Sequence, residues 1–180
     1  MGHKHTKEEI LEGALVAAFD EGLSQLTFGR LAKRMGISDR VIVYYFPSKD
    51  DLVGEVLYAM GTQLQQTLMA TFSSPAADHV ELLRWAWPIL ARPEADPVFA
   101  LFFEASGLAA TGREPYASLV PQLVEAWIAW ASGVIRGTPA RRRAEAEVAI
   151  AMFDGLLLLR QLAGPVVADR AARKIGAART

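Results

Sequence analysis

Apolar residues recur with a period close to 3.6 along nearly the whole chain. Near the N-terminus, for example, Ile10, Ala14, Ala17 and Ala18 fall on one face of a helix. No stretch combines a sustained period of two with hairpin turn residues, so we predict no strands. Segments rich in proline, glycine and serine separate the periodic stretches. We therefore expect an all-α protein with helices over residues 6–22, 27–35, 38–46, 48–70, 78–91, 98–108, 115–135 and 141–163, and a short helix after residue 164.

Residues that cap helices mark several of these boundaries. Thr6 and Glu9 form a capping box, in which the hydroxyl accepts one free backbone N–H and the glutamate accepts another. Thr27 suits the N-cap of the second helix, and Gly36 ends that helix. Ser48 and the acidic residues after it form a further capping signature. The N-terminal part of the chain is therefore expected to hold short helices with defined ends.

Residues 27–46 combine a short helix, a turn with glycine and a second short helix, which is the skeleton of a helix-turn-helix. Ala32 is small and lets the two helices approach each other closely. Gly36 permits the left-handed backbone that the turn needs. Ile37 and Ile42 can fill the interface between the helices. This spacing predicts a pair of helices that cross at a steep angle.

The second helix of this pair has two different faces when its residues are placed at intervals of about 100°. The inward arc holds Val41, Ile42 and Tyr45. The outward arc holds Asp39, Arg40, Val43 and Tyr44. Against DNA, Arg40 could pair with guanine, Val43 could touch a thymine methyl group, and Tyr44 could reach a phosphate or a base edge. Asp39 could accept a hydrogen bond from cytosine.

Basic residues gather around this arc. Residues 30–49 include five basic residues and one acidic residue, a local excess of +4, although the whole chain has a net charge of −1. Thr27 and Lys49 lie near helix ends and suit phosphate anchoring. The candidate DNA-contacting residues are therefore Thr27, Arg30, Ser38, Asp39, Arg40, Val43, Tyr44 and Lys49. The alternative is that these are ordinary exposed residues on a helical hairpin.

Residues 6–57 resemble the DNA-binding domain of the TetR (tetracycline repressor) family. The resemblance is carried by "FDEG" at the end of the first helix, by "LTFGRLAKRMGIS" and by "YYFPSKDDLV". Family members commonly have a tyrosine, two variable positions and an aromatic residue before the lysine that starts the next helix. Here Val43 stands in the place of the tyrosine, so it lacks the phenol with which relatives often contact the DNA backbone, and Phe46 takes the aromatic position. The resemblance implies that Lys49 grips a phosphate.

For the whole chain, the resemblance implies an N-terminal helix-turn-helix domain of three helices, residues 1–50, and a helical domain for effector binding and dimerisation, residues 51–180. It implies a transcriptional repressor that binds a palindromic operator in double-stranded DNA as a homodimer and is released by a ligand. A second hypothesis from another class is a helical carrier of small molecules whose DNA-binding head is vestigial. The basic residues around the predicted helix-turn-helix favour the regulator.

Composition narrows the classes of function. With 52% hydrophobic and 22% charged residues, the chain is expected to fold as a soluble protein. It has no cysteine, which excludes disulfides, thiolate metal ligands and cysteine nucleophiles. The N-terminus is polar and does not resemble a signal peptide, and the longest apolar run, residues 148–159, contains Asp154 and is too short to span a bilayer. We therefore expect a cytoplasmic protein without a membrane segment.

The sequence also lacks the common signatures of enzymes. It has no glycine-rich dinucleotide motif, no phosphate loop, no Gly-x-Ser-x-Gly and no Glu-x-x-His pair. We therefore expect no enzymatic activity, no catalytic residue, no metal site and no cofactor.

The two long segments near the C-terminus, residues 115–135 and 141–163, are apolar most of the way round. Such helices must be covered on two sides, and in a chain this short we expect a second subunit to provide one cover. Two DNA-binding heads about 34 Å apart would also give usable specificity. The candidate interface residues are Val124, Ile128, Ile150, Phe153 and Leu157, with Ala144, Ala146, Ala149, Ala151 and Gly155 permitting close approach. The alternative is that both helices are central in a monomeric bundle.

Aromatic residues concentrate in the middle helices and predict a cavity for a small apolar or aromatic effector. The candidate lining is Gln63, Trp85, Phe99, Phe103, Trp127 and Met152. Candidate polar groups for orienting the ligand are Gln63, His79, Glu104 and Gln122. The alternatives are that the aromatic residues only fill the core and that the polar residues belong to the surface.

Overall fold

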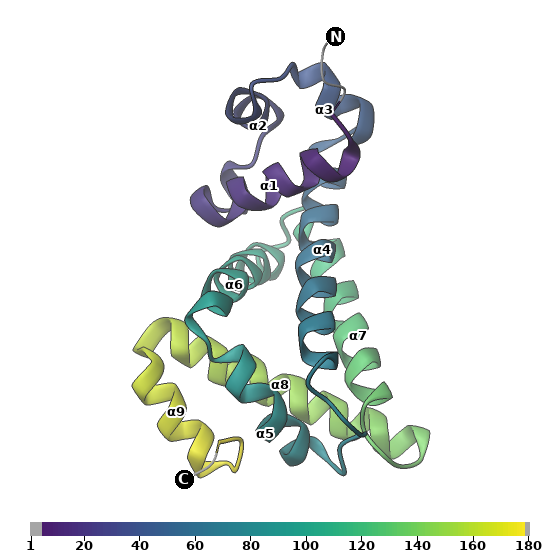
Figure 1. The fold of residues 1–180 in the computed structure, drawn as a ribbon, viewed down its shortest axis with the longest axis vertical. Helices are drawn as coiled ribbons and strands as arrows, with labels where there is room; N and C mark the ends of the chain where they lie inside the picture. Colours follow the sequence, from purple (N-terminus) through teal and green to yellow (C-terminus); the bar gives the residue numbers. More distant parts are fainter. Residues whose placement is uncertain (1–4, 179–180) are drawn as a thin grey trace. The chain divides into compact units, whose positions relative to one another are not determined.

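The computed structural model describes residues 5–178, and the regular structure in this range is helical (Figure 1). The helices are α1 (Lys7–Glu21), α2 (Phe28–Met35), α3 (Asp39–Tyr45), α4 (Lys49–Met69), α5 (His79–Leu90), α6 (Asp96–Ala110), α7 (Tyr116–Gly133), α8 (Pro139–Ala163) and α9 (Pro165–Lys174). Two 3-10 turns, η1 (Leu23–Gln25) and η2 (Pro93–Ala95), precede α2 and α6. The prediction of an all-α fold is confirmed, and the two short turns escaped prediction because three residues are too few to reveal a helical period.

The predicted caps are present at the ends of the first helices. Thr6 forms the capping box with Glu9, with the Glu9 N–H donating to the Thr6 hydroxyl at 3.2 Å and the Thr6 N–H donating to the Glu9 carboxylate at 3.0 Å. The Thr27 hydroxyl accepts from the backbone N–H of Arg30. Gly36 ends α2 in the left-handed conformation, with φ at 68°. Local capping chemistry therefore sets these boundaries before any tertiary packing is considered.

The described chain divides into two compact units. The first consists of the residues up to Gln63 together with Leu101–Val120, and the second of Leu64–Ala100 together with the residues from Pro121 onward. Each of α4, α6 and α7 therefore contributes residues to both units. A separate head bounded at residue 50 stays a prediction.

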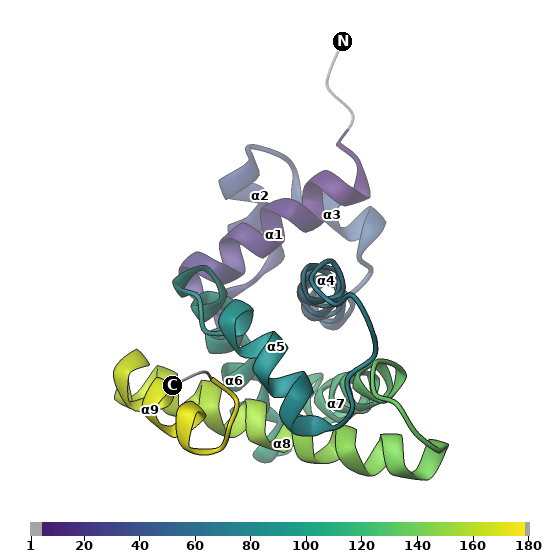
Figure 2. The same ribbon diagram turned by 60° about the horizontal axis from the view of Figure 1, so that its bottom comes forward.

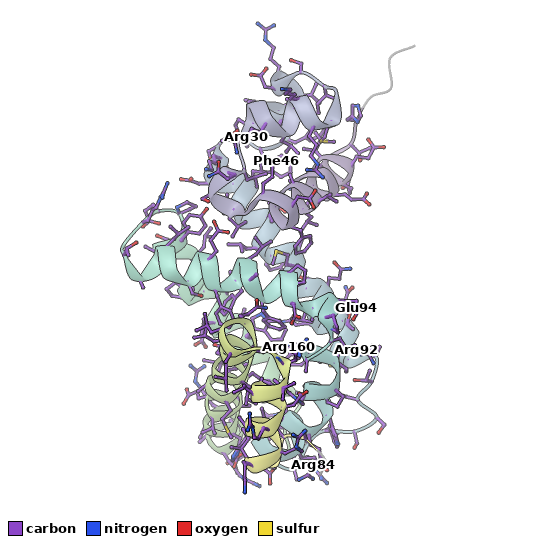
Figure 3. All side chains as sticks on the ribbon, turned by 90° about the vertical axis from the view of Figure 1, so that its left-hand side faces the viewer. Arg30, Phe46, Arg84, Arg92, Glu94 and Arg160 are labelled. Carbon is purple, nitrogen blue, oxygen red and sulfur yellow. The ribbon has the colours of Figure 1, made fainter. Side chains whose placement is uncertain are left out.

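Aromatic residues at the end of α3 close the core of the first unit. Phe46 is buried among the N-terminal helices (Figure 3), and the Lys7 ammonium lies 5.4 Å from the centre of its ring. Tyr45 is half-buried and its hydroxyl donates to the backbone oxygen of His5 at 3.0 Å. Lys7 also pairs with Glu55 of α4 at 2.5 Å. These contacts join the start of α1 to the junction between α3 and α4.

The second unit is built on α8, which packs against both α5 and α9 (Figure 2). The indole N–H of Trp87 in α5 donates to Asp169 of α9 at 3.1 Å. The backbone of Ala76 pairs with the end of α7: it donates to Val134 and accepts from Arg136, both at 2.8 Å. These bonds hold the start of α5 and the loop after α7 together.

The ion pair between Asp96 and Arg160 lies in the second unit (Figure 3 labels Arg160). The Arg160 guanidinium donates to both carboxylate oxygens of Asp96, at 2.6 and 3.0 Å, and the Gln161 side chain donates to the Asp96 backbone oxygen at 2.8 Å. The Arg160 side chain is only 6% exposed. The pair therefore fixes the first residue of α6 against the C-terminal half of α8. Within residues 5–178, no helix is long and apolar enough to cross a membrane.

Candidate nucleic-acid interface

The turn between α2 and α3 holds the two helices as the sequence predicts. The backbone N–H of Ile37 donates to Ala32 at 3.0 Å, across the left-handed Gly36. Ile42 is fully buried between the helices. Ser38 begins α3, and its hydroxyl accepts from the backbone N–H of Arg40 at 3.3 Å. The turn thereby fixes the direction of α3 relative to α2.

The outward face of α3 is exposed. Asp39, Arg40, Val43 and Tyr44 are all exposed, whereas Val41 and Tyr45 are half-buried. Tyr44 is 79% exposed and meets the Tyr45 ring edge-on, with ring centres 4.9 Å apart. The division of this helix into two faces, expected from its angular arithmetic, is therefore present in the structure.

Two exposed cations, one on α2 and one on α3, have no carboxylate partner within the described range. Among residues 5–178, neither the Arg40 guanidinium nor the Lys33 ammonium makes an ion pair or hydrogen bond. Lys49 lies at the start of α4, where its ammonium donates to the backbone oxygen of Ser24 at 3.4 Å. These three residues are available for phosphate or base contacts.

Two further arginines are held by carboxylates of α1. Arg34 pairs with Asp20 and lies 3.6 Å from Glu21, and Arg30 lies 3.6 Å from Glu21 and donates to Gln25 at 2.6 Å. Figure 3 labels Arg30, which lies in α2. The charge count over residues 30–49 did not include these acidic partners, because they precede residue 30 in the sequence. All these side chains are at least a third exposed, so the pairs are weak and can be exchanged for phosphates.

The predicted pocket residues are distributed over both units. Gln63 and Phe103 belong to the first unit, and Trp85, Phe99, Trp127 and Met152 belong to the second. In the second unit, an aromatic cluster joins Phe72, Trp85, Trp127 and Trp130. Phe72 lies 5.7 Å from Trp85 and 6.2 Å from Trp130, and Trp130 lies 5.2 Å from Trp127, measured between ring centres. Phe72 and Trp130 are the members outside the predicted lining, and Phe72 lies in the loop after α4.

The proposed polar groups have other partners. Glu104 accepts hydrogen bonds from the backbone of η1, and the imidazole and backbone N–H of His79 both contact Glu145 of α8, at 2.5 and 3.0 Å. These bonds from His79 hold the pKa of Glu145 below its ordinary value. Gln63 and Gln122 also have interaction partners. Glu104 and His79 therefore have structural roles in the chain.

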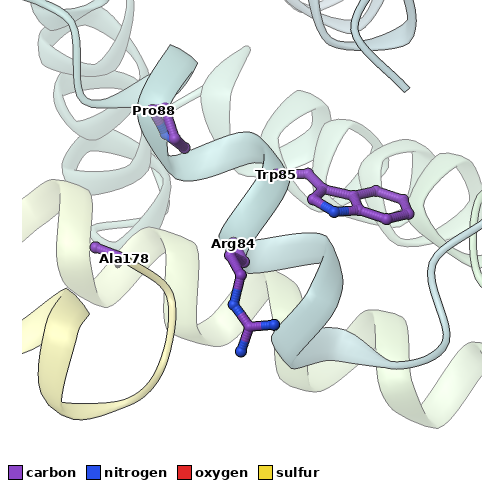
Figure 4. Close-up of a pocket in the computed structure, with 4 residues that line it drawn as sticks. All are labelled: Arg84, Trp85, Pro88 and Ala178. Atoms are coloured by element: carbon purple, nitrogen blue, oxygen red, sulfur yellow. The ribbon is translucent and has the colours of Figure 1, made fainter. Parts of the chain in front are cut away.

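A surface hollow of about 330 Å³ lies on α5, lined by Arg84, Trp85, Pro88 and Ala178 (Figure 4). Of the predicted pocket residues, Trp85 borders it. The Arg84 guanidinium and the Trp85 ring leave α5 in different directions. The two groups that could recognise a ligand thus do not converge.

The candidate interface residues lie in different environments. Phe153 is 6% exposed and Leu157 is 1% exposed, so both side chains fill the core of the second unit and not an exposed face. Val124, Ile128 and Ile150 are half-buried. The sequence could not separate the two apolar faces of α8, because both have helical spacing.

The opposite face of α8 carries an exposed stripe of small and apolar residues. We call this the α8 stripe; its members are Ala144, Val148, Ala151, Gly155, Leu158 and Leu162. They follow one another at alternating steps of four and three residues, which is the spacing of a helix-pairing seam. Nothing within 4 Å would obstruct a Cβ at Gly155. The stripe is therefore open along α8.

The geometry of α2 and α3 is that of a helix-turn-helix DNA-binding protein. Residues 10–56 match the family model for bacterial regulatory proteins of the tetR family. This match agrees with the sequence resemblance, and the chain has the fold of solved TetR-family transcriptional regulators.

Solved structures similar to the chain extend over nearly its whole length. A transcriptional regulator from Rhodococcus sp. Rha1 is 22% identical, with 96% of this chain and 95% of that chain covered and a TM-score of 0.73. A TetR transcriptional regulator from Legionella pneumophila is 23% identical, with 97% and 96% covered and a TM-score of 0.68. The multidrug binding protein EbrR, complexed with imidazole, is 21% identical, with 97% and 93% covered and a TM-score of 0.67. No curated protein sequence matches the chain.

Proposed function

We propose that the protein is a transcriptional repressor that binds a palindromic operator in double-stranded DNA as a homodimer and is released by a small apolar or aromatic effector. The observation that carries the proposal is the exposed face of α3, where Arg40 stands without a carboxylate partner among the described residues. An unpaired guanidinium on an exposed recognition helix can pair bidentately with guanine.

Contacts to the DNA backbone would come from helix ends around α3. Thr27 and Ser38 cap α2 and α3 with their hydroxyl oxygens, and the Thr27 hydroxyl hydrogen remains able to donate to a phosphate. The Ser38 hydroxyl donates to the Asp39 carboxylate at 3.5 Å and would exchange that long bond for a phosphate. Lys49 supplies a cation at the start of α4. Val43 and Tyr44 would add contact to a thymine methyl group and to the backbone, and Asp39 would accept from cytosine.

The α8 stripe supports the homodimer. A helix with an inner apolar face and a second, exposed apolar face needs a second cover. The small residues Ala144, Ala151 and Gly155 would let a partner helix approach, while Val148, Leu158 and Leu162 would fill the space between. Two copies of the same stripe can satisfy each other across a two-fold axis. We assign the dimer contact to this stripe, with Val124, Ile128 and Ile150 at its margins.

The aromatic cluster in the second unit supports an aromatic effector. The four rings offer stacking and apolar contact. EbrR, which has the same fold, has been solved with proflavin as well as with imidazole. Helix α4 runs without interruption from Lys49 to Met69. A shift of its C-terminal end, which belongs to the second unit, would therefore also move its N-terminal end next to α3. The effector would act by preferring the state that cannot bind DNA, and that preference limits the size of the effect.

The DNA-binding proposal is tested by selecting bound sites from random DNA at two salt concentrations. We expect a palindromic consensus. Arg40→Ala should weaken binding to the consensus by about 1–3 kcal/mol and relax one base position, since the bidentate pair with guanine is lost. Lys49→Ala should weaken all sequences alike and flatten the salt dependence, since it removes a phosphate contact. Equal loss on consensus and random DNA for Arg40→Ala would remove Arg40 from the base readers.

The effector proposal is tested with proflavin as the probe. Saturable quenching of tryptophan fluorescence should accompany a fall in operator affinity, because the same binding event favours the released state. Replacement of Trp127 by leucine should weaken the binding of the dye. Trp87→Phe is the control and should leave dye binding unchanged, because Trp87 is buried and hydrogen-bonded to Asp169. A saturating dye that leaves operator affinity unchanged would contradict release by this ligand class. Dye binding by a protein that selects no DNA sequence would favour the carrier hypothesis.

A further inference from the structure

Glu104 of α6 makes an unusual contact within the first unit. Its two carboxylate oxygens accept hydrogen bonds from consecutive backbone N–H groups of η1, from Leu23 at 3.0 Å and from Ser24 at 2.9 Å. The partners are 81 and 80 residues apart in the sequence. A carboxylate that accepts two backbone N–H groups forms a charge-assisted, two-point contact with a defined geometry.

The turn lacks a cap of its own. Gly22 precedes η1 with φ at 88° and offers no side chain to accept the free N–H groups at the start of the turn. A Cβ at position 22 would lie 3.1 Å from a carboxylate oxygen of Glu104. Glycine therefore serves both the left-handed backbone and the space for the carboxylate. Glu104 acts in space as an N-cap residue would act in sequence.

The capped turn leads directly to groups that face DNA in the proposed function. The backbone oxygen of Ser24 accepts from Lys49, and the Gln25 side chain accepts from Arg30. The next residue after Leu26 is Thr27, the N-cap of α2. A displacement of η1 would thus shift the phosphate contacts that set the register of α3 on a specific site, whereas on random DNA, which has no base register, the same groups can bind other phosphates.

We propose that Glu104 is a positioning residue for DNA recognition, which sets the start of α2 relative to α3 and α4 by closing η1. The inference rests on the proposed DNA-binding function.

The test compares Glu104→Gln with the wild-type protein on the selected consensus and on random DNA. Glutamine keeps the size of the side chain but has one acceptor oxygen, and its amide group would face a backbone donor. We expect consensus affinity to fall about tenfold and random-DNA affinity to change less than about twofold. A merely structural role would lower the folded fraction and reduce both affinities by the same factor.

Glu12→Gln is the charge-matched control. Glu12 is an exposed residue of α1 in the same unit, and it has no hydrogen bond or ion pair within the described part of the chain. Its substitution removes the same charge and should leave the ratio of consensus to random affinity unchanged. An unchanged ratio in Glu104→Gln, or an equal change in Glu12→Gln, overturns the positioning role.

Two outcomes separate this inference from the proposed function. If the wild-type protein selects no sequence, the DNA-binding function fails and the positioning role with it; if only the Glu104 comparison fails, the DNA-binding function stands. Hydrogen exchange of the wild-type protein covers the case in which Glu104→Gln does not fold. The amides of Leu23 and Ser24 should exchange far more slowly than in an unstructured peptide, and exchange at the unstructured rate overturns the proposal.

Discussion

Leu158→Asp should convert the protein from a dimer into a monomer and lower its operator affinity by more than about a hundredfold. Leu158 belongs to the α8 stripe and is 40% exposed in the single chain. In a two-fold interface the substitution occurs twice, and each copy loses the burial of a leucine, about 1.5–3 kcal/mol. Each copy also brings a charge into an apolar contact. Analytical ultracentrifugation measures the dimer, and a DNA-binding titration measures the operator affinity.

The control for this prediction is Val16→Asp, which places the same charge at a residue of α1 that is 45% exposed. Val16 lies in the first unit and outside the α8 stripe, so the dimer should persist. The far-UV circular dichroism of Leu158→Asp should remain that of the wild-type protein, since Leu158 is outside the core of the single chain. A Leu158→Asp protein that still sediments as a dimer would move the interface away from the stripe.

Arg160→Ala should lower the free energy of unfolding by about 3 kcal/mol, a large fraction of the roughly 5–15 kcal/mol that a domain has in total. The guanidinium is almost wholly buried and binds both oxygens of Asp96. Its removal leaves the Asp96 carboxylate without its partner at the start of α6, where solvent can compensate only in part, because Asp96 is 36% exposed. Urea denaturation followed by circular dichroism measures the change.

Arg143→Ala is the matched control for the buried pair. Arg143 also binds a carboxylate with two bonds, to Glu125 at 2.5 and 2.8 Å, but its side chain is 48% exposed. Exposed pairs contribute about 0–1 kcal/mol, so this substitution should be nearly neutral. If Arg160→Ala and Arg143→Ala lowered the free energy of unfolding equally, burial would not be what makes the Arg160 pair important.

The helices and their caps were predictable because their determinants are local. Thr6 with Glu9, Thr27 and Gly36 act within a few residues of themselves, and the two faces of α3 follow from the helical period. The two faces of α8 show where this argument ends. Leu157 and Leu158 are both apolar, yet one is in the core and the other is exposed, because only the tertiary packing of α5 and α9 decides which face is inner.

The remaining contacts of the candidate site depend on groups that are distant in sequence or outside the motif. Glu104 was expected as a possible ligand contact, and its carboxylate instead caps a turn about 80 residues away. The helical period of apolar residues cannot predict a contact between a side chain and a backbone turn so far apart in the sequence. Asp20 and Glu21 were visible beside the motif, and a charge count that began at α1 would have found them.

The carboxylates at the end of α1 also affect how the protein would search for its operator. On random DNA, Arg30 and Arg34 can contact a phosphate only by giving up Glu21 or Asp20, so each such contact gains less than that of an unpaired arginine. A genome offers about 10⁶–10⁹ competing sites, so weaker residence on each of them leaves more of a scarce regulator free. The Arg40 guanidinium has no partner among residues 5–178, so within that range it gives up no contact when it binds a guanine. The α1 carboxylates would therefore weaken the phosphate contacts of Arg30 and Arg34 on every DNA sequence alike, so that the base contact of Arg40 makes up a larger share of the binding at the operator.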